Sequence, residues 1–260
     1  ARALLKPRVE GYQRLLGYAV FRADGRLVAA GTSPYDPGLL AGRSVEIQSL
    51  FYSYPPIVGQ ATALVAGIPS PVIFAAWIAA SVAVLAPVAR LIRDQFAPAV
   101  PWLVPVVASV ALAPLWFPFT VGALFGNLDV FFPALYGLVV VAAAAGDGPG
   151  ATARRRVVVG GVALALASIT KLHPALLALW FALRGVRVVR ARAGGRAEAS
   201  RAGIPPPWIV LVAATATGLT ILAMSLVVGG AQPWLDYGAV LRASANVDLL
   251  DHRNLGPAVQ

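Results

Sequence analysis

The chain has 260 residues, of which 58% are hydrophobic and only 12% are charged, with a formal net charge of +10. A soluble domain carries about twice that fraction of charged residues, so the composition indicates a membrane protein. Because the basic residues form short clusters between apolar runs rather than one polar face, no nucleic-acid partner is expected. The absence of cysteine excludes disulfides and thiolate metal sites, and two histidines are too few for a histidine-rich metal centre.

The first part of the chain, residues 1–56, is predicted to be a loop region on the extracytoplasmic side. It is rich in aromatic residues, and its amphipathic pattern favours a short helix over residues 22–30. A turn is expected at residues 33–37, with the sequence Ser-Pro-Tyr-Asp-Pro, because proline and aspartate are typical turn residues. The side of residues 1–17 stays open, because their basic residues favour the cytoplasm.

Residues 57–228 are predicted to form a bundle of transmembrane helices. Within it, residues 71–91 form an apolar run long enough to cross a hydrocarbon core of roughly 30 Å, with Arg90 and Arg93 at its end. Positive charges mark cytoplasmic ends, so this end is expected in the cytoplasm. The other apolar runs before the next basic cluster are residues 57–68, 97–126 and 130–145.

A broken apolar hairpin is predicted over residues 157–183, interrupted by Lys171-Leu172-His173-Pro174. Proline removes a helix hydrogen bond and disfavours helical geometry at the residue before it, so a break is expected there. Arginines flank both outer ends, which favours a hairpin that enters and leaves on the cytoplasmic side. A lysine near the far end of this hairpin indicates a functional site, while a single kinked span with a snorkelling lysine remains the alternative.

The last third of the chain continues this alternation of sides. A basic cytoplasmic loop is expected over residues 184–206, a span over residues 208–228 and an extracytoplasmic tail over residues 229–260. Most acidic residues fall in segments assigned to the extracytoplasmic side. We therefore expect carboxylates, tyrosines and the hairpin lysine to share one surface.

Such a surface suits one kind of chemistry. Carboxylates act as general bases, cationic groups neutralise a phosphate leaving group, and aromatic side chains pack against sugar rings or prenyl chains. The combination predicts transfer of a sugar from a lipid phosphate. The sequence has no P-loop, no Gly-x-Gly-x-x-Gly motif after a strand and no set of kinase motifs, so a nucleotide donor is unsupported.

Four motifs occur in order: the turn at residues 33–37, Tyr52-x-Tyr54-Pro55-Pro56, Gly126-Asn127-x-Asp129 and Lys171-x-x-Pro174. In this order and spacing, the chain resembles the polytopic GT-C glycosyltransferases of family 87 over about residues 17–190. These are polyprenyl-phosphate-mannose-dependent mannosyltransferases of actinobacterial-type membranes.

The resemblance implies an all-α polytopic membrane protein, with a GT-C-like bundle of transmembrane helices and an extracytoplasmic loop domain. It implies an inverting hexosyltransferase of the plasma (inner) membrane, multi-pass, with its active site on the extracytoplasmic face. The expected donor is a polyprenyl-phosphate-linked sugar, with mannose as the hexose, and the acceptor is a glycolipid or glycan. Membrane lipid is the other expected partner. No cofactor is implied, although a divalent ion between acids and phosphate stays an open alternative.

The chain departs from the family near its start. Such enzymes usually carry an Asp that opens the first external loop, just before an x-x-Val-aromatic pattern. Residues 20–21 keep that pattern, but Gly17 and Tyr18 stand where the Asp belongs. We therefore expect a fragment of a longer protein. The candidates for the catalytic base are Asp24, on the same helix face as Gly17, and Asp36, or else a base that this chain lacks.

The other candidate site residues divide into two groups. Lys171, His173 and Arg22 are expected to bind the donor phosphate. The expected contacts to sugar and acceptor are Tyr35, Tyr54, Asn127, Asp129, Asp236 and Tyr237. Structural roles remain open for several of them, because Asn and Asp commonly cap helices and stabilise turns. No residue is assigned to a metal.

Two other functions remain open. A polytopic transporter or lipid flippase also uses broken helices with polar residues near the midplane, although the chain has no second copy of the Lys-His-Pro interruption. A non-catalytic partner of a glycan-assembly complex is suggested by the absent Asp.

Overall fold

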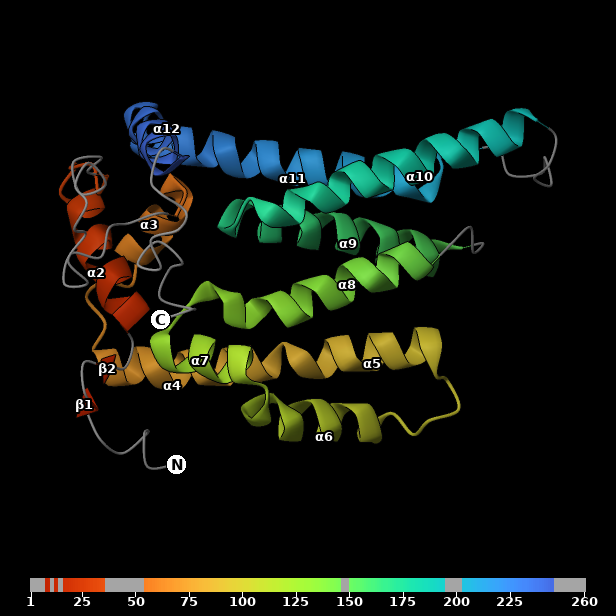
Figure 1. The fold of residues 1–260 in the computed structure, drawn as a ribbon, viewed down its shortest axis with the longest axis horizontal. Helices are drawn as coiled ribbons and strands as arrows, with labels where there is room; N and C mark the ends of the chain where they lie inside the picture. Colours follow the sequence, from red (N-terminus) through yellow and green to blue (C-terminus); the bar gives the residue numbers. More distant parts are fainter. Residues whose placement is uncertain are drawn as a thin grey trace. The chain divides into compact units, whose positions relative to one another are not determined.

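The computed structural model describes residues 8–9, 12–13, 16–35, 54–145, 150–194 and 203–245. These residues are helical except for one antiparallel pair of short strands, β1 (Arg8–Val9) and β2 (Tyr12–Gln13) (Figure 1). The α-helices are α2 (Leu16–Ala29), α3 (Pro56–Ala63), α4 (Ser70–Ala83), α5 (Leu85–Phe96), α6 (Leu103–Leu112), α7 (Phe117–Phe125), α8 (Phe132–Ala144), α9 (Ala151–Thr170), α10 (Leu176–Ala193), α11 (Pro206–Gly229) and α12 (Gln232–Ala245). The 3₁₀ turns are η2 (Ala113–Leu115), η3 (Leu128–Phe131) and η4 (His173–Ala175). The predicted helical class is confirmed for the described residues.

Two helical stretches are long and apolar enough to cross a membrane, Pro71–Phe96 and Pro206–Gly229. With 26 and 24 residues, they are about 39 Å and about 36 Å long, against a hydrocarbon core of roughly 30 Å. Only 17% and 11% of their most apolar windows are buried, whereas a core helix of a soluble protein would be mostly buried. Both stretches cover residues where spans were predicted, and they support membrane association.

The chain divides into two compact units, each with its own apolar core. The first unit comprises Ala1–Ser81, Pro114–Val130 and Ile221–Gln260, and the second comprises Val82–Ala113 and Phe131–Thr220. The first core is partly aromatic and contains Phe21, Tyr35, Val58, Tyr237 and Val240. The second core contains Val139, Ala142, Val157, Ala163, Leu164, Phe181 and Val210.

Helix α2 starts earlier than the sequence pattern predicted, at Leu16 rather than at residue 22. The expectation was wrong at this end because the aromatic residues before position 22 were read as loop, although no proline interrupts them. The helix is followed by Gly31, whose φ of +73° is a left-handed conformation that favours glycine. The backbone N–H of Thr32 donates to the carbonyl oxygen of Leu27 at 2.8 Å, which closes the helix end.

The chain between α9 and α10 is interrupted where the Lys-Leu-His-Pro sequence stands. Helix α9 ends at Thr170, and Lys171 is extended with φ −145° and ψ 140°. The turn η4 then begins at His173, one residue before the buried Pro174. Both helices continue outward through the flanking arginines, beyond the apolar halves that the sequence pattern marked, because arginine is a good helix former.

Helices α8 and α9 lie side by side in the second unit (Figure 1). They approach so closely that a Cβ added at Gly160 of α9 would overlap the Cβ of Ala142 in α8. On α8, a Cβ added at Gly137 would come within 2.5 Å of a methyl carbon of Val88 in α5. These close approaches fix the position of α8 along the axes of α5 and α9.

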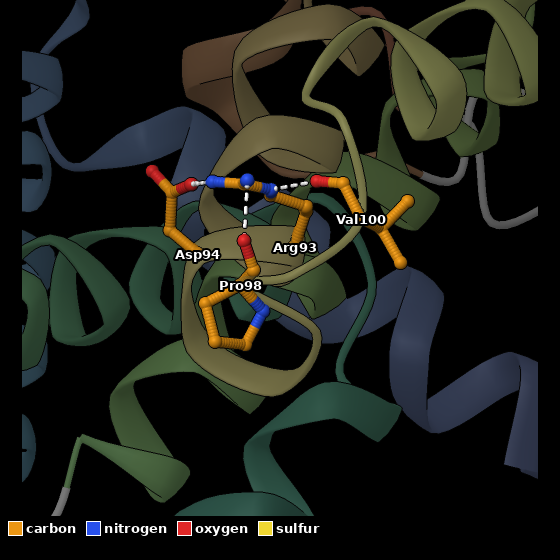
Figure 2. A network of polar contacts seen from close by, with 4 residues as sticks. All are labelled: Arg93, Asp94, Pro98 and Val100. Atoms are coloured by element: carbon orange, nitrogen blue, oxygen red, sulfur yellow. Dashed lines mark hydrogen bonds and ion pairs between the residues drawn. The ribbon is translucent and has the colours of Figure 1, made fainter.

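The end of α5 is closed by one arginine side chain. The Nε of Arg93 donates to the carbonyl oxygen of Val100 and its Nη2 to that of Pro98, both at 2.5 Å (Figure 2). Its Nη1 donates to Oδ1 of Asp94 at 2.7 Å. A cation in the last turn is favourable to the helix dipole, and here it also holds the loop after the helix.

Candidate functional site

The first unit contains eight of the predicted site residues, delivered by separate segments of the chain. They are Arg22 and Asp24 on α2, Tyr35 in the turn after α2, Tyr54 before α3, Asn127 and Asp129 after α7, and Asp236 and Tyr237 on α12. Hydrogen bonds and ring contacts, with Phe21 as the contact from α2, join these segments into one cluster.

Two tyrosines and an asparagine form the centre of the cluster. The hydroxyl of Tyr35 donates to the carbonyl oxygen of Tyr54 at 2.6 Å, and the hydroxyl of Tyr54 donates to Oδ1 of Asn127 at 2.9 Å. The same Oδ1 accepts the backbone N–H of Asp129 at 3.2 Å. Because a backbone N–H only donates, this bond fixes which end of the amide is oxygen. Three segments are therefore held together through Tyr54 and Asn127.

Local sequence explains why Asn127 stands at this point. Helix α7 ends at Phe125 and is followed by Gly126, which has a left-handed φ of +71°, and the N–H of Asn127 donates back to the oxygen of Gly122 at 2.8 Å. The bond from Asp129 to the side chain of Asn127 caps the turn η3. The structural role left open for Asn127 is thus present, in addition to its contact with Tyr54.

Aromatic contacts attach α12 to the same cluster. The rings of Tyr35 and Tyr237 have centroids 5.5 Å apart, and those of Trp234 and Tyr237 are 6.2 Å apart. The ring of Phe21 meets Tyr54 edge to face at 4.9 Å. Such tilted and edge-on arrangements are the favourable ones for aromatic pairs, so the cluster is packed as well as hydrogen-bonded.

A second polar link in this unit was missed by the sequence analysis. The indole N–H of Trp234 donates to Oγ of Ser225 at 3.0 Å, and Nε2 of Gln60 donates to the carbonyl oxygen of Ser225 at 3.0 Å. The signal was a polar amide, Gln60, inside the apolar run of residues 57–68. This link joins α3, α11 and the start of α12.

Asp24 is the carboxylate in this cluster with the most unusual environment. Its side chain is buried, with 9% exposure, and its Oδ2 has no hydrogen-bond partner among the described residues. Burial raises the pKa of Asp24 to about 7, because a desolvated carboxylate is disfavoured. A carboxyl group that titrates near the working pH is suited to take a proton as a general base.

Helix α2 packs closely against α3 at the residue next to Asp24. Gly25, which follows Asp24 in α2, allows α2 to approach α3 so closely that a Cβ added at Gly25 would lie 2.9 Å from the carbonyl carbon of Thr62. Arg22, one turn away, donates its Nε to the carbonyl oxygen of Ala66 at 2.9 Å. The guanidinium of Arg22 therefore has a structural contact to the segment after α3.

The tyrosines of the cluster are held in their protonated, donor form. Burial raises the pKa of Tyr35, and the nearby groups Tyr237, Asp24 and Asp236 raise it further. Burial also raises the pKa of Tyr54, with a further contribution from the charge of Asp129. Asp24 and Asp236 thus raise the pKa of Tyr35, and Asp129 raises the pKa of Tyr54. Asp236 additionally accepts a hydrogen bond from Nε2 of Gln232 at 2.8 Å within α12.

Lys171 and His173 belong to the second unit. The backbone N–H of Lys171 donates to the oxygen of Ala167 at 3.0 Å, and its side chain is partly exposed. The ring of His173 has its Nε2 3.0 Å from the hydroxyl of Tyr136 and stands edge-on to Phe132, with centroids 5.8 Å apart. The sequence analysis did not single out Tyr136, which lies within the apolar run of residues 130–145.

Asp36, the second candidate base, lies outside the described residues. Within the described part of the chain, no group of three or more His, Cys, Asp or Glu side chains is placed to hold a metal ion. The assignment of each catalytic or binding role remains a prediction.

Residues 52–258 match the family model described as Glycosyltransferase family 87. The match covers well over half of the chain and extends beyond the motif-based resemblance to include α12. Of the candidate residues, Arg22, Asp24, Tyr35 and Asp36 precede the matched range. No curated protein and no solved structure matches the chain.

Proposed function

Because the chain belongs to glycosyltransferase family 87, we propose that it transfers a hexose from a polyprenyl-phosphate donor to a lipid or glycan acceptor. The family membership itself confirms the predicted resemblance and makes the chain a glycosyltransferase, with a sugar donor and an acceptor as substrates. Mannose as the sugar and the extracytoplasmic face of the plasma membrane as the location are part of the proposal.

The proposed architecture is a GT-C-like bundle over residues 57–228, with extracytoplasmic segments at residues 1–56 and 229–260. It is supported by the two membrane-length helices and by the flanking arginines, which favour cytoplasmic placement of the end of α5, the start of α9 and the end of α10. In this arrangement the aromatic and acidic cluster of the first unit belongs to the extracytoplasmic side.

The observation that carries the proposal is the environment of Asp24. A buried carboxyl group, whose Oδ2 has no hydrogen-bond partner among the described residues and whose pKa is about 7, lies near enough to Tyr35 to raise the pKa of that tyrosine. Most surface carboxylates titrate near their ordinary value of roughly 4. A pKa near neutrality is the property that a general base needs, and this chain, a member of a glycosyltransferase family, has it at Asp24.

In the proposed reaction, Asp24 takes the proton of an acceptor hydroxyl while the hydroxyl oxygen attacks the anomeric carbon. The new bond joins the acceptor oxygen to that carbon, and the bond from the carbon to the phosphate oxygen breaks with inversion. Lys171 and His173 stay candidates, by residue type, for stabilising the charge of a departing phosphate, because cationic and N–H donor groups stabilise the charge that develops in the transition state. Tyr35, Tyr54, Asn127 and Asp129 would orient sugar and acceptor.

The test uses membranes that contain the full-length protein, incubated with radiolabelled polyprenyl-phosphate-mannose. Transfer predicts a new labelled glycolipid or glycan. A flippase predicts only that the labelled donor changes sides, and a non-catalytic partner predicts neither result. Loss of a general base costs about 10²–10⁴ in rate, so Asp24→Asn should lower transfer to that extent.

Two matched variants sharpen this experiment. Asp36→Asn removes the other candidate carboxylate. If Asp24→Asn keeps full transfer and Asp36→Asn loses it, Asp36 rather than Asp24 is the general base. Asp94→Asn removes an acid that is paired with Arg93 in the second unit, and it should leave transfer unchanged.

A further inference from the structure

One contact in the second unit involves a residue to which no role has been given. The hydroxyl of Tyr136 on α8 lies 3.0 Å from Nε2 of His173 in η4, although 37 positions separate the two residues. Phe132 stands on the same face of α8, one turn before Tyr136, and its ring touches both Tyr136 and His173 edge-on. The imidazole is therefore bounded by two aromatic side chains of one helix.

The fold fixes this contact from several directions. The close approach of Gly160 to Ala142 fixes the position of α9 along the axis of α8, and therefore the point on α8 beside which α9 ends. The buried Pro174 and the short turn η4 hold the backbone directly after Lys171 and Leu172. The position of His173 against Tyr136 thus follows from helix packing rather than from a loose loop.

The two groups have unequal acid and base strengths. A phenol has an ordinary pKa of about 10, and a neutral imidazole is a much better proton acceptor than a phenol oxygen. The favoured hydrogen bond therefore runs from the O–H of Tyr136 to a bare Nε2, which leaves the ring proton on Nδ1. Among the described residues, Nδ1 of His173 has no hydrogen-bond partner, so its N–H is available to a ligand.

We propose that Tyr136 is a positioning residue that holds neutral His173 in the Nδ1–H form, so that this N–H is the donor offered to a phosphate oxygen. The phosphate part rests on the proposed function, whereas the choice of ring proton does not. Tyr136 itself touches neither the sugar nor the phosphate in this scheme. Lys171, two residues before His173, supplies the positive charge.

The chain is well suited to a direct test, because it contains only two histidines, His173 and His252. A His252→Ala background leaves one imidazole, whose ¹⁵N chemical shifts report which nitrogen carries the proton. In the full-length protein labelled with ¹⁵N-histidine, at a pH where the ring is neutral, we expect the Nδ1–H form to predominate. In Tyr136→Phe the ring should shift to the Nε2–H form, which predominates in free histidine.

Tyr136→Phe is a conservative variant, because the ring that packs against Phe132 is retained. Thr170→Val is the matched control: it removes a hydroxyl three residues from His173, and that hydroxyl bonds only to carbonyl oxygens of its own helix, Leu166 and Ala167. The control should keep the Nδ1–H form. A ring that carries its proton mainly on Nε2 in the background protein, or that is unchanged by Tyr136→Phe, would overturn the positioning role.

The transfer assay separates this inference from the proposed function. If His173 contacts the donor phosphate through Nδ1–H, Tyr136→Phe should lower kcat/KM for the donor mainly through kcat, because the phosphate charge develops in the transition state, and Thr170→Val should change neither constant. A switched ring proton with an unchanged kcat and an unchanged donor KM supports the positioning role and removes His173 from the reaction. Absence of any transfer by the parent protein contradicts the proposed function and leaves the spectroscopic result valid.

Discussion

The hydroxyl of Tyr54 donates to Oδ1 of Asn127 at 2.9 Å across 73 positions of the chain. This bond connects the segment before α3 to the segment after α7, and the hydroxyl of Tyr35 binds the backbone of Tyr54 from the turn after α2. The candidate site of the first unit therefore depends on pairings between distant segments more than on any single motif.

Tyr54→Phe should destabilise the protein by about 1 kcal/mol, because one hydrogen bond is lost while the ring contact with Phe21 stays. In a double-mutant cycle with Asn127→Ala, the two losses should not add, and the coupling in the free energy of unfolding, from thermal or denaturant unfolding, should be roughly 0.5–3 kcal/mol. Thr220→Val is the control partner, since its hydroxyl bonds Ala216 of its own helix. If Tyr54→Phe shows the same coupling with Thr220→Val as with Asn127→Ala, the hydrogen bond between Tyr54 and Asn127 does not stabilise the fold.

The pH dependence of stability should carry the signature of Asp24. The folded carboxyl has a pKa of about 7, above its unfolded value of roughly 4, so the folded state binds this proton more tightly. Stability from Asp24 is therefore fully present below about pH 4 and is lost as the pH rises through about 7.

Asp24→Asn should flatten this decline, because the amide does not titrate. At pH 8 the variant should unfold at a higher temperature than the parent, by roughly 2–4 °C for each 1 kcal/mol of the lost stability. Thermal scans between pH 5 and pH 8 measure the effect. A parent and variant with parallel midpoints over this range would contradict the buried environment of Asp24.

Gly160→Ala should separate α8 from α9, because its Cβ would overlap that of Ala142. Overpacking of this kind costs about 1–3 kcal/mol. Gly218→Ala on α11 is the matched control, since nothing lies within 4 Å of its added Cβ, and alanine should gain up to about 1 kcal/mol there as the better helix former. Adding Ala142→Gly to Gly160→Ala should restore much of the loss, and midpoints that fail to recover would contradict the contact.

Lys171→Ala should lower transfer by about 10²–10³ if its charge stabilises the leaving phosphate, a typical loss for one such group. Its side chain is partly exposed, so the unfolding midpoint should change little. Arg155→Ala, at the other end of α9, removes the same charge from an exposed position and should keep full activity. Unchanged transfer by Lys171→Ala would remove the proposed role.

Features with a local cause were predictable from the sequence. The long apolar runs correspond to the two membrane-length helices, and the sequence around Pro174 coincides with the interruption between α9 and α10. Proline geometry and apolar length act over a few residues, so they can be read without knowing the fold. The start of α2 was missed, because aromatic residues are found in helices and loops alike.

The partners of individual side chains were not predictable. Tyr136 and His173, or Gln60 and Ser225, meet only because particular helix faces pack together, and their residue types do not encode that choice. The same holds for Asp24, whose pKa is raised because the fold buries its side chain. A sequence shows which residues are capable of a role, and packing decides their surroundings.

The arginines of the second unit are not equivalent. Arg184 donates to the carbonyl oxygen of Ala143 at 2.7 Å, and Arg156 donates to Oε1 of Gln95 at 2.7 Å, whose amide in turn binds the oxygen of Ala144. Arg184 therefore binds the carboxyl end of α8 directly, and Arg156 binds it through Gln95, whereas Arg154 and Arg155 are exposed. Charge-reversal experiments that map the membrane topology should therefore begin with Arg154 and Arg155. Replacement of Arg156 or Arg184 would also break hydrogen bonds at the helix end, so a change of orientation could not be told from unfolding.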